Sequence, residues 1–281
     1  MVSVCMKERL TVTLEKDILE SVDKRIDGRH IKNRSHAIEL LLLKSLGDNA
    51  PKKALILAGG KGTRLKPITH EIPKPLILIK GRPILEHILD LLRQHNVKDI
   101  IMSIGYKKEQ IKNYFGDGSK FGVNIVYVEE DKSQGTAGAI KLAKQYHNDT
   151  FIIVNGDNLY DLDITDIFTF HKQHHAIATM ALTSTKDTRE YGVVELKGNK
   201  IVDFSEKPKN SNSNFINSGF YIAEPEIIDH IPEGFAMLES TVFPKLAKQN
   251  KLFGYPFSGQ WFDISNLKEY EKAIKNWRGI K

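Results

Sequence analysis

The chain has little cysteine and no long apolar stretch. Cys5 is the only cysteine among 281 residues, so an internal disulfide and a zinc site built from several thiolates are both excluded. No apolar run approaches the roughly 20 residues that a membrane-spanning helix needs, and the N-terminus lacks the apolar core of a secretory signal. We therefore expect a soluble cytoplasmic protein without a membrane partner.

The charge is moderately basic. The net charge is +6 at pH 7, with 41% hydrophobic and 27% charged residues. This composition is typical of a folded chain with one large domain and a small one. A basic surface suits phosphate-bearing small molecules as well as nucleic acid, so charge alone does not separate these two kinds of partner.

The N-terminal part contains an alternating segment followed by two amphipathic stretches. Polar and apolar residues alternate over Arg9–Leu14, which predicts a half-buried strand. Apolar spacing predicts helices over Glu15–Ile26 and His36–Leu46. Ser35 is the predicted N-cap of the second helix.

From Ala54 onward, apolar segments of strand length alternate with segments of helical spacing. This order is typical of an α/β fold with a mainly parallel sheet. The expected strands are Ala54–Ala58, Asp99–Ile104, Asn124–Val128 and Phe151–Asn155, followed by a run of strands over Ala176–Ile222. The expected helices are Ile84–Gln94, Lys108–Phe115, Ala137–Gln145, Ile164–His174 and Leu267–Trp277. The chain thus divides into an N-terminal module (1–48), a linker (49–53) and an α/β domain (54–281).

A glycine-rich loop follows the first expected strand of this domain. Glycines within Gly59–Gly62 can direct backbone N–H groups at phosphate oxygens. A P-loop is excluded because no Gly-Lys-Ser/Thr follows four intervening residues, and Leu65 stands where a Rossmann pattern needs its last glycine. Lys61, Arg64 and Lys74 add positive charge that a plain turn does not need.

The stretch Gly59–Leu76, GGKGTRLKPITHEIPKPL, resembles the signature GGxGTRLxPxTxxxPKPL of the sugar-1-phosphate nucleotidyltransferases. Further motifs of that family follow in order: Gly135–Ala139, Asn155–Asp157, Glu206–Pro208, Asn217–Gly219 and Trp261–Asp263. The resemblance covers about residues 53–281. It implies a Rossmann-like mixed, mainly parallel sheet and transfer of a nucleoside monophosphate from an NTP to a sugar 1-phosphate, with release of pyrophosphate.

The resemblance implies roles for individual residues in the nucleotide site. Arg64 would hold the β- and γ-phosphates as a bidentate donor, and Lys74 would neutralise the transferred phosphoryl group. Asp157 and Asp263 would hold Mg²⁺ between them, since this hard ion prefers carboxylate oxygens. The expected nucleotide-binding residues are Ala58, Gly59, Gly60, Gly62, Thr63, Glu130, Gly135 and Thr136.

A second group of residues would bind the sugar phosphate. By resemblance, Lys207 would bind its phosphate, and Glu206 would accept hydrogen bonds from sugar hydroxyls. Gly192 and Asn217 match positions that line the sugar pocket in relatives, and Gly156 belongs to the same expected set. Because both reactants are anions, catalysis would depend on charge neutralisation and positioning.

The nucleobase stays open at this point. Glu130 can accept from the guanine N1–H and N2–H pair or from the single N3–H of uracil or thymine, and Gln134 departs from the leucine common in relatives. The segment Glu239–Asp263 resembles guanylyltransferases that act on manno-configured sugars. It favours GTP with a mannose- or heptose-type 1-phosphate. A uridylyl- or thymidylyltransferase for a glucose-type 1-phosphate is the alternative.

The N-terminal module resembles the ribbon-helix-helix (CopG/Arc-like) family. About 40 residues bury too little apolar surface to fold alone, so the resemblance implies an intertwined homodimer and leaves a higher oligomer open. Arg9, Thr11 and Thr13 would form a ribbon for the DNA major groove, with Ser35 near a DNA phosphate. Nine lysine and arginine residues against eight acidic ones over 1–50 make the module nearly neutral, unlike most DNA-binding surfaces. Dimerisation alone, operator binding, and a regulator that senses nucleotide sugars all stay open.

Overall fold

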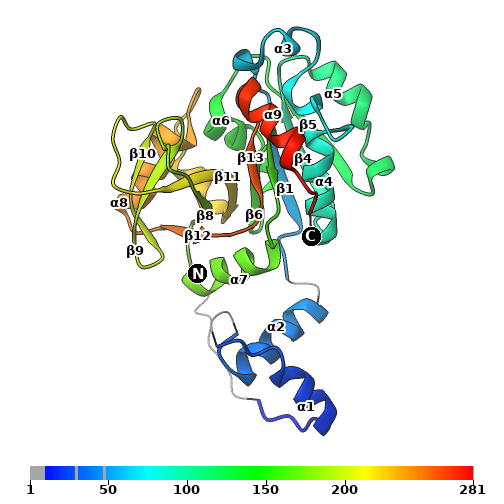
Figure 1. Ribbon diagram of the computed structural model, residues 1–281, viewed down its shortest axis with the longest axis vertical. Helices are drawn as coiled ribbons and strands as arrows, with labels where there is room; N and C mark the ends of the chain where they lie inside the picture. The colour runs from blue at the N-terminus through cyan, green and yellow to red at the C-terminus, as the bar shows by residue number, and fades with distance from the viewer. Residues whose placement is uncertain (1–9, 29–30, 47–48, 281) are drawn as a thin grey trace. The chain divides into compact units, whose positions relative to one another are not determined.

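Figure 1 shows the computed structural model, which describes residues 10–28, 31–46 (backbone only over 43–46) and 49–280. The chain divides into two compact units, Met1–Asn49 and Ala50–Lys281. Within the described residues, no helix has both the length and the apolar character needed to cross a bilayer.

The described part of the N-terminal unit contains two helices. α1 spans Lys16–Asp23, shorter at both ends than predicted, and α2 spans Arg34–Leu46. A bidentate ion pair joins them, since the Arg34 guanidinium donates to both carboxylate oxygens of Asp23 at 2.6 and 2.7 Å. Gly28 takes a φ of +71° between the helices, a conformation that glycine adopts without strain.

The strand predicted over Arg9–Leu14 is not formed in the described chain. A strand needs a neighbouring strand to satisfy its hydrogen bonds, and none lies beside residues 10–14 in the part of this unit that is described. Arg9 itself lies outside the described residues. The apolar side chains of the segment are left exposed, Leu10 to 79% and Val12 to 53%.

The prediction of Ser35 as an N-cap was wrong. α2 begins one residue earlier, at Arg34, and the Asn33 side chain accepts a hydrogen bond from the backbone N–H of His36 at 3.0 Å. Asn33 is therefore the N-cap, because its amide oxygen reaches the third residue of the helix. Ser35 lies within the first turn and is exposed.

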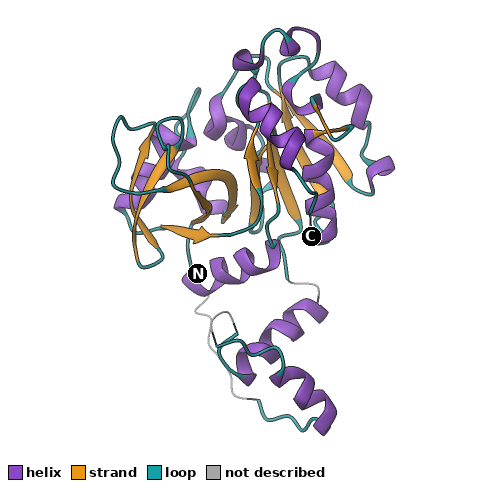
Figure 2. Ribbon diagram, viewed as in Figure 1, coloured by secondary structure: helices purple, strands orange, loops and turns teal. Residues whose placement is uncertain are grey.

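The second unit is built on a nine-stranded mixed sheet in the order β5-β4-β1-β6-β11-β8-β12-β10-β9 (Figure 2). The strands are β1 Lys53–Ala58, β4 Asp99–Ile104, β5 Asn124–Glu129, β6 Phe151–Asn155, β8 Ala178–Ser184, β9 Gly192–Lys197, β10 Lys200–Glu206, β11 Phe215–Ala223 and β12 Leu252–Pro256. Two small sheets pair β2 Leu78–Ile79 with β3 Arg82–Pro83, and β7 Asn158–Tyr160 with β13 Trp261–Asp263. The predicted strands and the α/β class are confirmed.

The helices cover both faces of this sheet. Their bounds are α3 Ile68–Glu71, α4 Ile84–Gln94, α5 Lys108–Phe115, α6 Gly135–Leu142, α7 Ile164–His174, α8 Phe243–Lys248 and α9 Leu267–Asn276. Buried residues of α4, α5, α7 and α9 pack on one face, and those of α6 and α8 pack on the other. The side chains of β1 alternate between these two cores, with Ile56 in the first and Leu55 in the second. Burial on both faces explains why β1 reads as a continuous apolar run.

The order of the strands creates a switch point beside β1. β1 pairs in parallel with β4 on one side and with β6 on the other. The chain runs from β1 through β4 to β5 before it returns to β6. Ligands of open α/β sheets bind outside the carboxyl ends of strands at such a point. The antiparallel pairings occur only in the half of the sheet formed by β6 and later strands.

A polar cluster ties α7 to the opposite edge of the sheet, at the amino end of β6. His171 contacts Thr179 Oγ1 at 2.8 Å and Glu224 Oε1 at 3.2 Å. Thr150 and Lys172 also donate to the Glu224 carboxylate. Burial opposes ionisation of Glu224, but the hydrogen bonds from His171, Lys172 and Thr150 outweigh it and lower its pKa to about 2.

We expect Glu224→Gln to destabilise the fold by about 2 kcal/mol near pH 7 after allowance for solvent screening. A carboxyl whose pKa falls from 4.5 to about 2 on folding stabilises the protein above its unfolded pKa. That contribution is lost as the pH falls through this window. The difference in urea unfolding free energy between wild type and variant should therefore shrink from pH 5 to pH 2. A difference that stays constant with pH would contradict this, and Glu226→Gln, at an exposed neighbour, is the matched control.

Candidate active site

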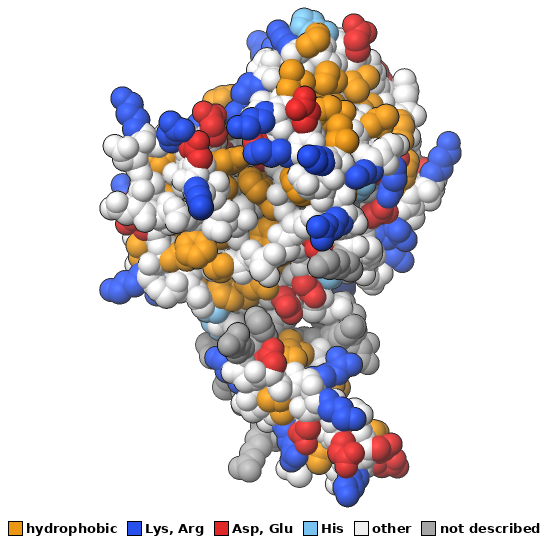
Figure 3. Space-filling model, viewed as in Figure 1, with side chains coloured by type: hydrophobic (Ala, Val, Ile, Leu, Met, Phe, Trp, Pro, Cys, Tyr) orange, Lys and Arg blue, Asp and Glu red, His pale blue; other side chains and the backbone are white. Residues whose placement is uncertain are grey.

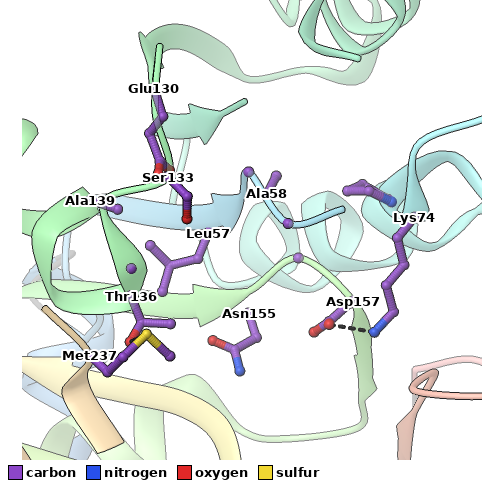
Figure 4. Close-up of a pocket in the computed structure, with 15 residues that line it drawn as sticks. Leu57, Ala58, Lys74, Glu130, Ser133, Thr136, Ala139, Asn155, Asp157 and Met237 are labelled. Carbon is purple, nitrogen blue, oxygen red and sulfur yellow. Dashed lines mark hydrogen bonds and ion pairs between the residues drawn. The ribbon is translucent and has the colours of Figure 1, made fainter. Parts of the chain in front are cut away.

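A cavity of about 260 Å³ opens at the carboxyl ends of β1 and β6, beside the N-terminus of α6 (Figure 4). The predicted site residues that line it are Ala58, Gly59, Gly60, Lys74, Glu130, Gly135, Thr136, Gly156 and Asp157. The lining residues that were not predicted are Leu57, Pro75, Ser133, Ala139, Asn155 and Met237. The cavity thus gathers segments that lie far apart in the sequence.

The glycine-rich loop lies directly against Glu130. A Cβ added to Gly59 would lie 2.7 Å from Glu130 Oε1, so only glycine fits without a shift. Glu130 accepts hydrogen bonds from Ser103 Oγ at 2.7 Å and from the Gln134 backbone N–H at 2.9 Å. Both of its oxygens already have a protein donor, and a nucleobase would have to use the remaining lone pairs.

A buried lysine forms an ion pair with a carboxylate just beyond the carboxyl end of β6. Lys74 opens the short 3₁₀ helix Lys74–Leu76 and is only 8% exposed. Its Nζ donates to Asp157 Oδ2 at 2.5 Å, the contact drawn dashed in Figure 4. Gly156 allows β6 to approach β1 closely just before Asp157, because a Cβ there would lie 3.0 Å from the Leu57 carbonyl oxygen. One fixed cation and one carboxylate therefore face the cavity together.

A second carboxylate lies close to this pair. Asp263 sits on β13 opposite Asn158 of β7, and Ile264 N–H donates to the Asp157 carbonyl at 3.2 Å. Burial raises the pKa of Asp263 to about 6, and the charge of Asp157 adds to the rise while Lys74 opposes it. A carboxylate beside the charge of Asp157 fits a divalent cation, whose positive charge would favour the ionised form of Asp263. No group of three or more potential metal ligands occurs among the described residues.

Arg64, Thr63 and Gly62 are not brought into the cavity lining. The Arg64 guanidinium lies 3.3 Å from Glu190 Oε2, and both side chains are more than half exposed. Thr63 is exposed as well, and Gly62 has a φ of +61° and packs on Thr69. Arg64 is still near enough to lower the pKa of Asp263 by its charge.

The remaining predicted residues Gly192, Glu206, Lys207 and Asn217, here called the sugar-side group, also lie outside the cavity lining. Gly192 and Glu206 are register partners on β9 and β10, and a Cβ on Gly192 would lie 2.9 Å from Glu206 Oε2. Asn217 on β11 donates to Tyr221 Oη at 2.8 Å. The pKa of Glu206 is raised by lost hydration and is lowered in part by Lys207. β9 pairs with β10 and, at one position, with β11, so the sugar-side group lies along three neighbouring strands.

The predicted nucleotide-binding segment Gly135–Ala139 at the start of α6, here called the nucleotide loop, is held by a segment that lies far away in the sequence. The Ala236 carbonyl accepts from the backbone N–H groups of Ala137 and Gly138 at 3.0 and 3.1 Å. Thr136 Oγ1 donates to Glu239 Oε2 at 2.7 Å. The sequence motif Gly135–Ala139 gave no sign of this partner, because about a hundred residues separate the two segments.

A cation and carboxylates beside a glycine-lined cavity, at the switch point of an α/β sheet, are typical of proteins that bind phosphorylated ligands. The chain matches the model of the Nucleotidyl transferase family over residues 53–278 and belongs to that family. Members of this family typically use a divalent metal.

Three relatives illustrate the range of the family. A UTP–glucose-1-phosphate uridylyltransferase from Synechocystis is 41% identical over 79% of this chain and 62% of its own length. A mannose-1-phosphate guanylyltransferase from Mycobacterium tuberculosis is 35% identical over 81% of this chain and 65% of its own length. A crystal structure from Bacillus anthracis, described as a candidate glucose-1-phosphate thymidylyltransferase in complex with sucrose, is 28% identical with a TM-score of 0.76, covering 82% of this chain and 96% of its own. The chain therefore spans less than two thirds of the two curated relatives.

We expect Gly135→Ala to destabilise the protein by about 1–3 kcal/mol. Gly135 has a φ of +75°, and a Cβ there would lie 2.4 Å from the Ala236 carbonyl oxygen, which is backbone and cannot rotate away. Gly60→Ala is the matched control, because Gly60 lines the same cavity and nothing lies within 4 Å of an added Cβ there. Equal melting temperatures for the two variants would contradict this account of Gly135.

Proposed function

We propose that the α/β unit transfers a nucleoside monophosphate from an NTP to a sugar 1-phosphate, giving a nucleotide sugar and pyrophosphate. The observation that carries the proposal is the buried Lys74–Asp157 contact at the end of a glycine-lined cavity, in a chain of the Nucleotidyl transferase family. A sugar-phosphate oxygen attacks the α-phosphorus and pyrophosphate leaves. Both partners are anions, so fixed positive charge in a recess is the main requirement.

Each part of the cavity has a proposed task in this reaction. Backbone N–H groups of Gly59 and Gly60 bind phosphate oxygens, and Lys74 neutralises the transferred phosphoryl group. Arg64 binds the β- and γ-phosphates after its exposed contact with Glu190 opens. We infer that the cation is Mg²⁺, held by Asp157 and Asp263; when bound, it offsets phosphate charge.

For the substrates, we propose GTP with a mannose- or heptose-type 1-phosphate. The motif segment Glu239–Asp263 supports this choice, as does the guanylyltransferase relative. The uridylyl and thymidylyl relatives support the alternative, a glucose-type 1-phosphate with UTP or dTTP. Glu130 is compatible with both, because its carboxylate can accept from either kind of base.

The test is pyrophosphate release with Mg²⁺ for GTP, UTP, dTTP, CTP and ATP, each against a panel of sugar 1-phosphates. We expect turnover with one pair, and a loss of about 100-fold or more in Asp157→Asn with nucleotide binding retained. Asp149→Asn, at an exposed site, should match wild type. Silence across the panel with nucleotide binding intact would refute transfer and favour a protein that senses nucleotide sugars.

We also propose that the N-terminal unit is a ribbon-helix-helix module through which two copies pair. Among its described residues only two hydrophobic side chains are buried, Val22 and Ala37. Leu10, Val12 and Leu14 are exposed on alternate positions of one segment. Pairing this segment with the same segment of a second copy would bury these side chains and supply strand hydrogen bonds.

Operator binding by this module is a further arm of the same proposal. Thr11, Thr13 and Ser35 are exposed in the described residues, while Arg9 lies outside them. Figure 3 shows acidic and basic side chains interspersed over the visible face of the larger unit rather than gathered as one basic surface. We propose that the N-terminal module makes the DNA contact.

We expect Leu10→Asp with Val12→Asp to convert a dimer into a 31.9 kDa monomer, measured by light scattering, because two charges would enter the buried strand pair. Thr11→Ala with Thr13→Ala is the control and should stay dimeric. Operator binding would be supported if Thr11→Ala with Thr13→Ala abolishes a salt-sensitive complex of wild type with promoter DNA while the dimer stays intact. A monomeric wild-type chain would refute the pairing.

A further inference from the structure

Glu239 lies where the nucleotide loop meets the sugar-side group. Its Oε2 accepts the hydrogen bond from Thr136, a residue of the cavity lining. Burial raises the pKa of Glu239, and the charge of Asp157 adds to the rise. Burial is the largest cause of the raised pKa of both Glu206 and Tyr221, and the negative charge of Glu239 is the second largest. This carboxylate is therefore close to the cavity and to the sugar-side group at once.

The orientation of this carboxylate is fixed. Thr136 Oγ1 accepts from the Leu238 backbone N–H at 2.8 Å, so its single proton is given to Glu239. The alternative acceptor, Met237 Sδ, is 4.0 Å away and binds a proton weakly. The hydrogen bonds of Ala236 to the first turn of α6 hold the same segment in place. Glu239 is thus aimed by its neighbours rather than left to rotate.

Glu239 and Glu206 have no counterion among the residues that the structure describes. Neither forms an ion pair within the described part of the chain, and Lys207 acts on both only through its charge at longer range. Two carboxylates with raised pKa values and no ion pair weaken a fold. Such pairs are typical of sites that are completed by a ligand.

Asn155 provides an acceptor without a hydrogen-bond donor among the described residues. Its Oδ1 is buried and has no hydrogen-bond partner within the described residues, although buried polar atoms are normally paired. Asn155 lies in the cavity between Thr136 and Asp157 (Figure 4). Its amide packs on Gly219, where an added Cβ would lie 2.6 Å from Asn155 Nδ2. The amide is therefore held in place without a donor.

We propose that Glu239 and Asn155 bind hydroxyl groups of the sugar and that Thr136 positions Glu239 for this contact. The inference rests on the proposed transfer to a sugar 1-phosphate. Both groups offer acceptors, and the hydroxyl groups of a sugar ring are donors that satisfy them. A uronic acid would bring a further carboxylate toward Glu239 and Glu206. The site therefore selects sugar 1-phosphates whose ring carries free hydroxyls.

The first experiment measures the contribution of the sugar to binding, by calorimetry with GDP, UDP and dTDP and with GDP-mannose, UDP-glucose and dTDP-glucose. We expect wild type to bind one nucleotide sugar at least about 10-fold more tightly than its nucleotide, and Glu239→Gln to abolish this ratio. If wild type binds none of the nucleotide sugars more tightly than the matching nucleotide, this inference is overturned even if transfer is observed. A ratio without turnover would refute the proposed transfer and leave the hydroxyl contacts standing.

The second experiment separates hydroxyl binding from a structural role. With the active pair, Glu239→Gln should raise the KM for the sugar 1-phosphate by about 10- to 100-fold and change the KM for the NTP by less than about 3-fold. A sugar 1-phosphate that lacks the hydroxyl bound by Glu239 should be a poor substrate for wild type, and Glu239→Gln should raise its KM no further. A sugar 1-phosphate that lacks the hydroxyl bound by Asn155 should show the same pattern with Asn155→Ala.

Two comparisons complete the design. Thr136→Val should raise the KM for the sugar 1-phosphate as Glu239→Gln does, and Thr136→Ser should restore this KM, because serine keeps the donor. Glu195→Gln, an exposed carboxylate on β9, should change neither KM. Two results would overturn the proposal. One is an equal rise in the KM for the sugar 1-phosphate and the KM for the NTP with Glu239→Gln. The other is a further rise in the KM of every deoxy sugar 1-phosphate with both Glu239→Gln and Asn155→Ala.

Discussion

The hydrogen bond from Gly156 N–H to the Leu57 carbonyl, at 2.9 Å, joins the ends of β1 and β6. It extends the parallel register of the two strands by one step, up to the point where both chains leave the sheet. A side chain at Gly156 would crowd the same carbonyl oxygen at 3.0 Å. Because the strands end together, the glycine-rich loop and Asp157 emerge side by side, and Lys74 can reach the carboxylate. The cavity therefore depends on a backbone contact that carries no chemistry of its own.

The charges around this contact explain why the site suits a phosphate and a cation together. Asp157 and Asp263 lie near one buried lysine, so the negative charge exceeds the positive charge in a recess with little water. A phosphate alone would meet this excess unfavourably, and a divalent ion alone would compete with Lys74 for Asp157. Bound together, the ion and the phosphate supply opposite charges, which low-dielectric surroundings strengthen. Burial is the main cause of the raised pKa of Asp263, and the negative charge of Asp157 adds to it.

Local pattern predicted the elements of the α/β unit and much of its cavity. Continuous apolar runs such as β1 and helical spacing such as α4 depend on near neighbours in sequence, and the glycine motif lies directly after its strand. The partners Met237 and Glu239 could not be predicted in this way, because they reach Thr136 from about a hundred residues away through an irregular π-helical turn. The N-cap of α2 was misplaced by two residues, since Asn33 and Ser35 are both good caps and only geometry separates them. The strand over residues 10–14 did not form, because no neighbouring strand lies beside it among the described residues.

The two sides of the cavity differ in how much they must move to bind substrate. Thr136, Glu239 and Ala236 take part in hydrogen bonds of 2.7 to 3.1 Å that join the nucleotide loop to the segment beside the sugar-side group. Ordering that side on binding costs little conformational entropy, which is the advantage of preorganisation. Arg64 is the opposite case, because it rests on an exposed carboxylate at 3.3 Å, a contact worth about 0–1 kcal/mol. A phosphate can displace that contact with little loss. In the proposed reaction, the hydrogen-bonded groups thus fix the geometry, and Arg64, which is held by one exposed contact, reaches the departing pyrophosphate.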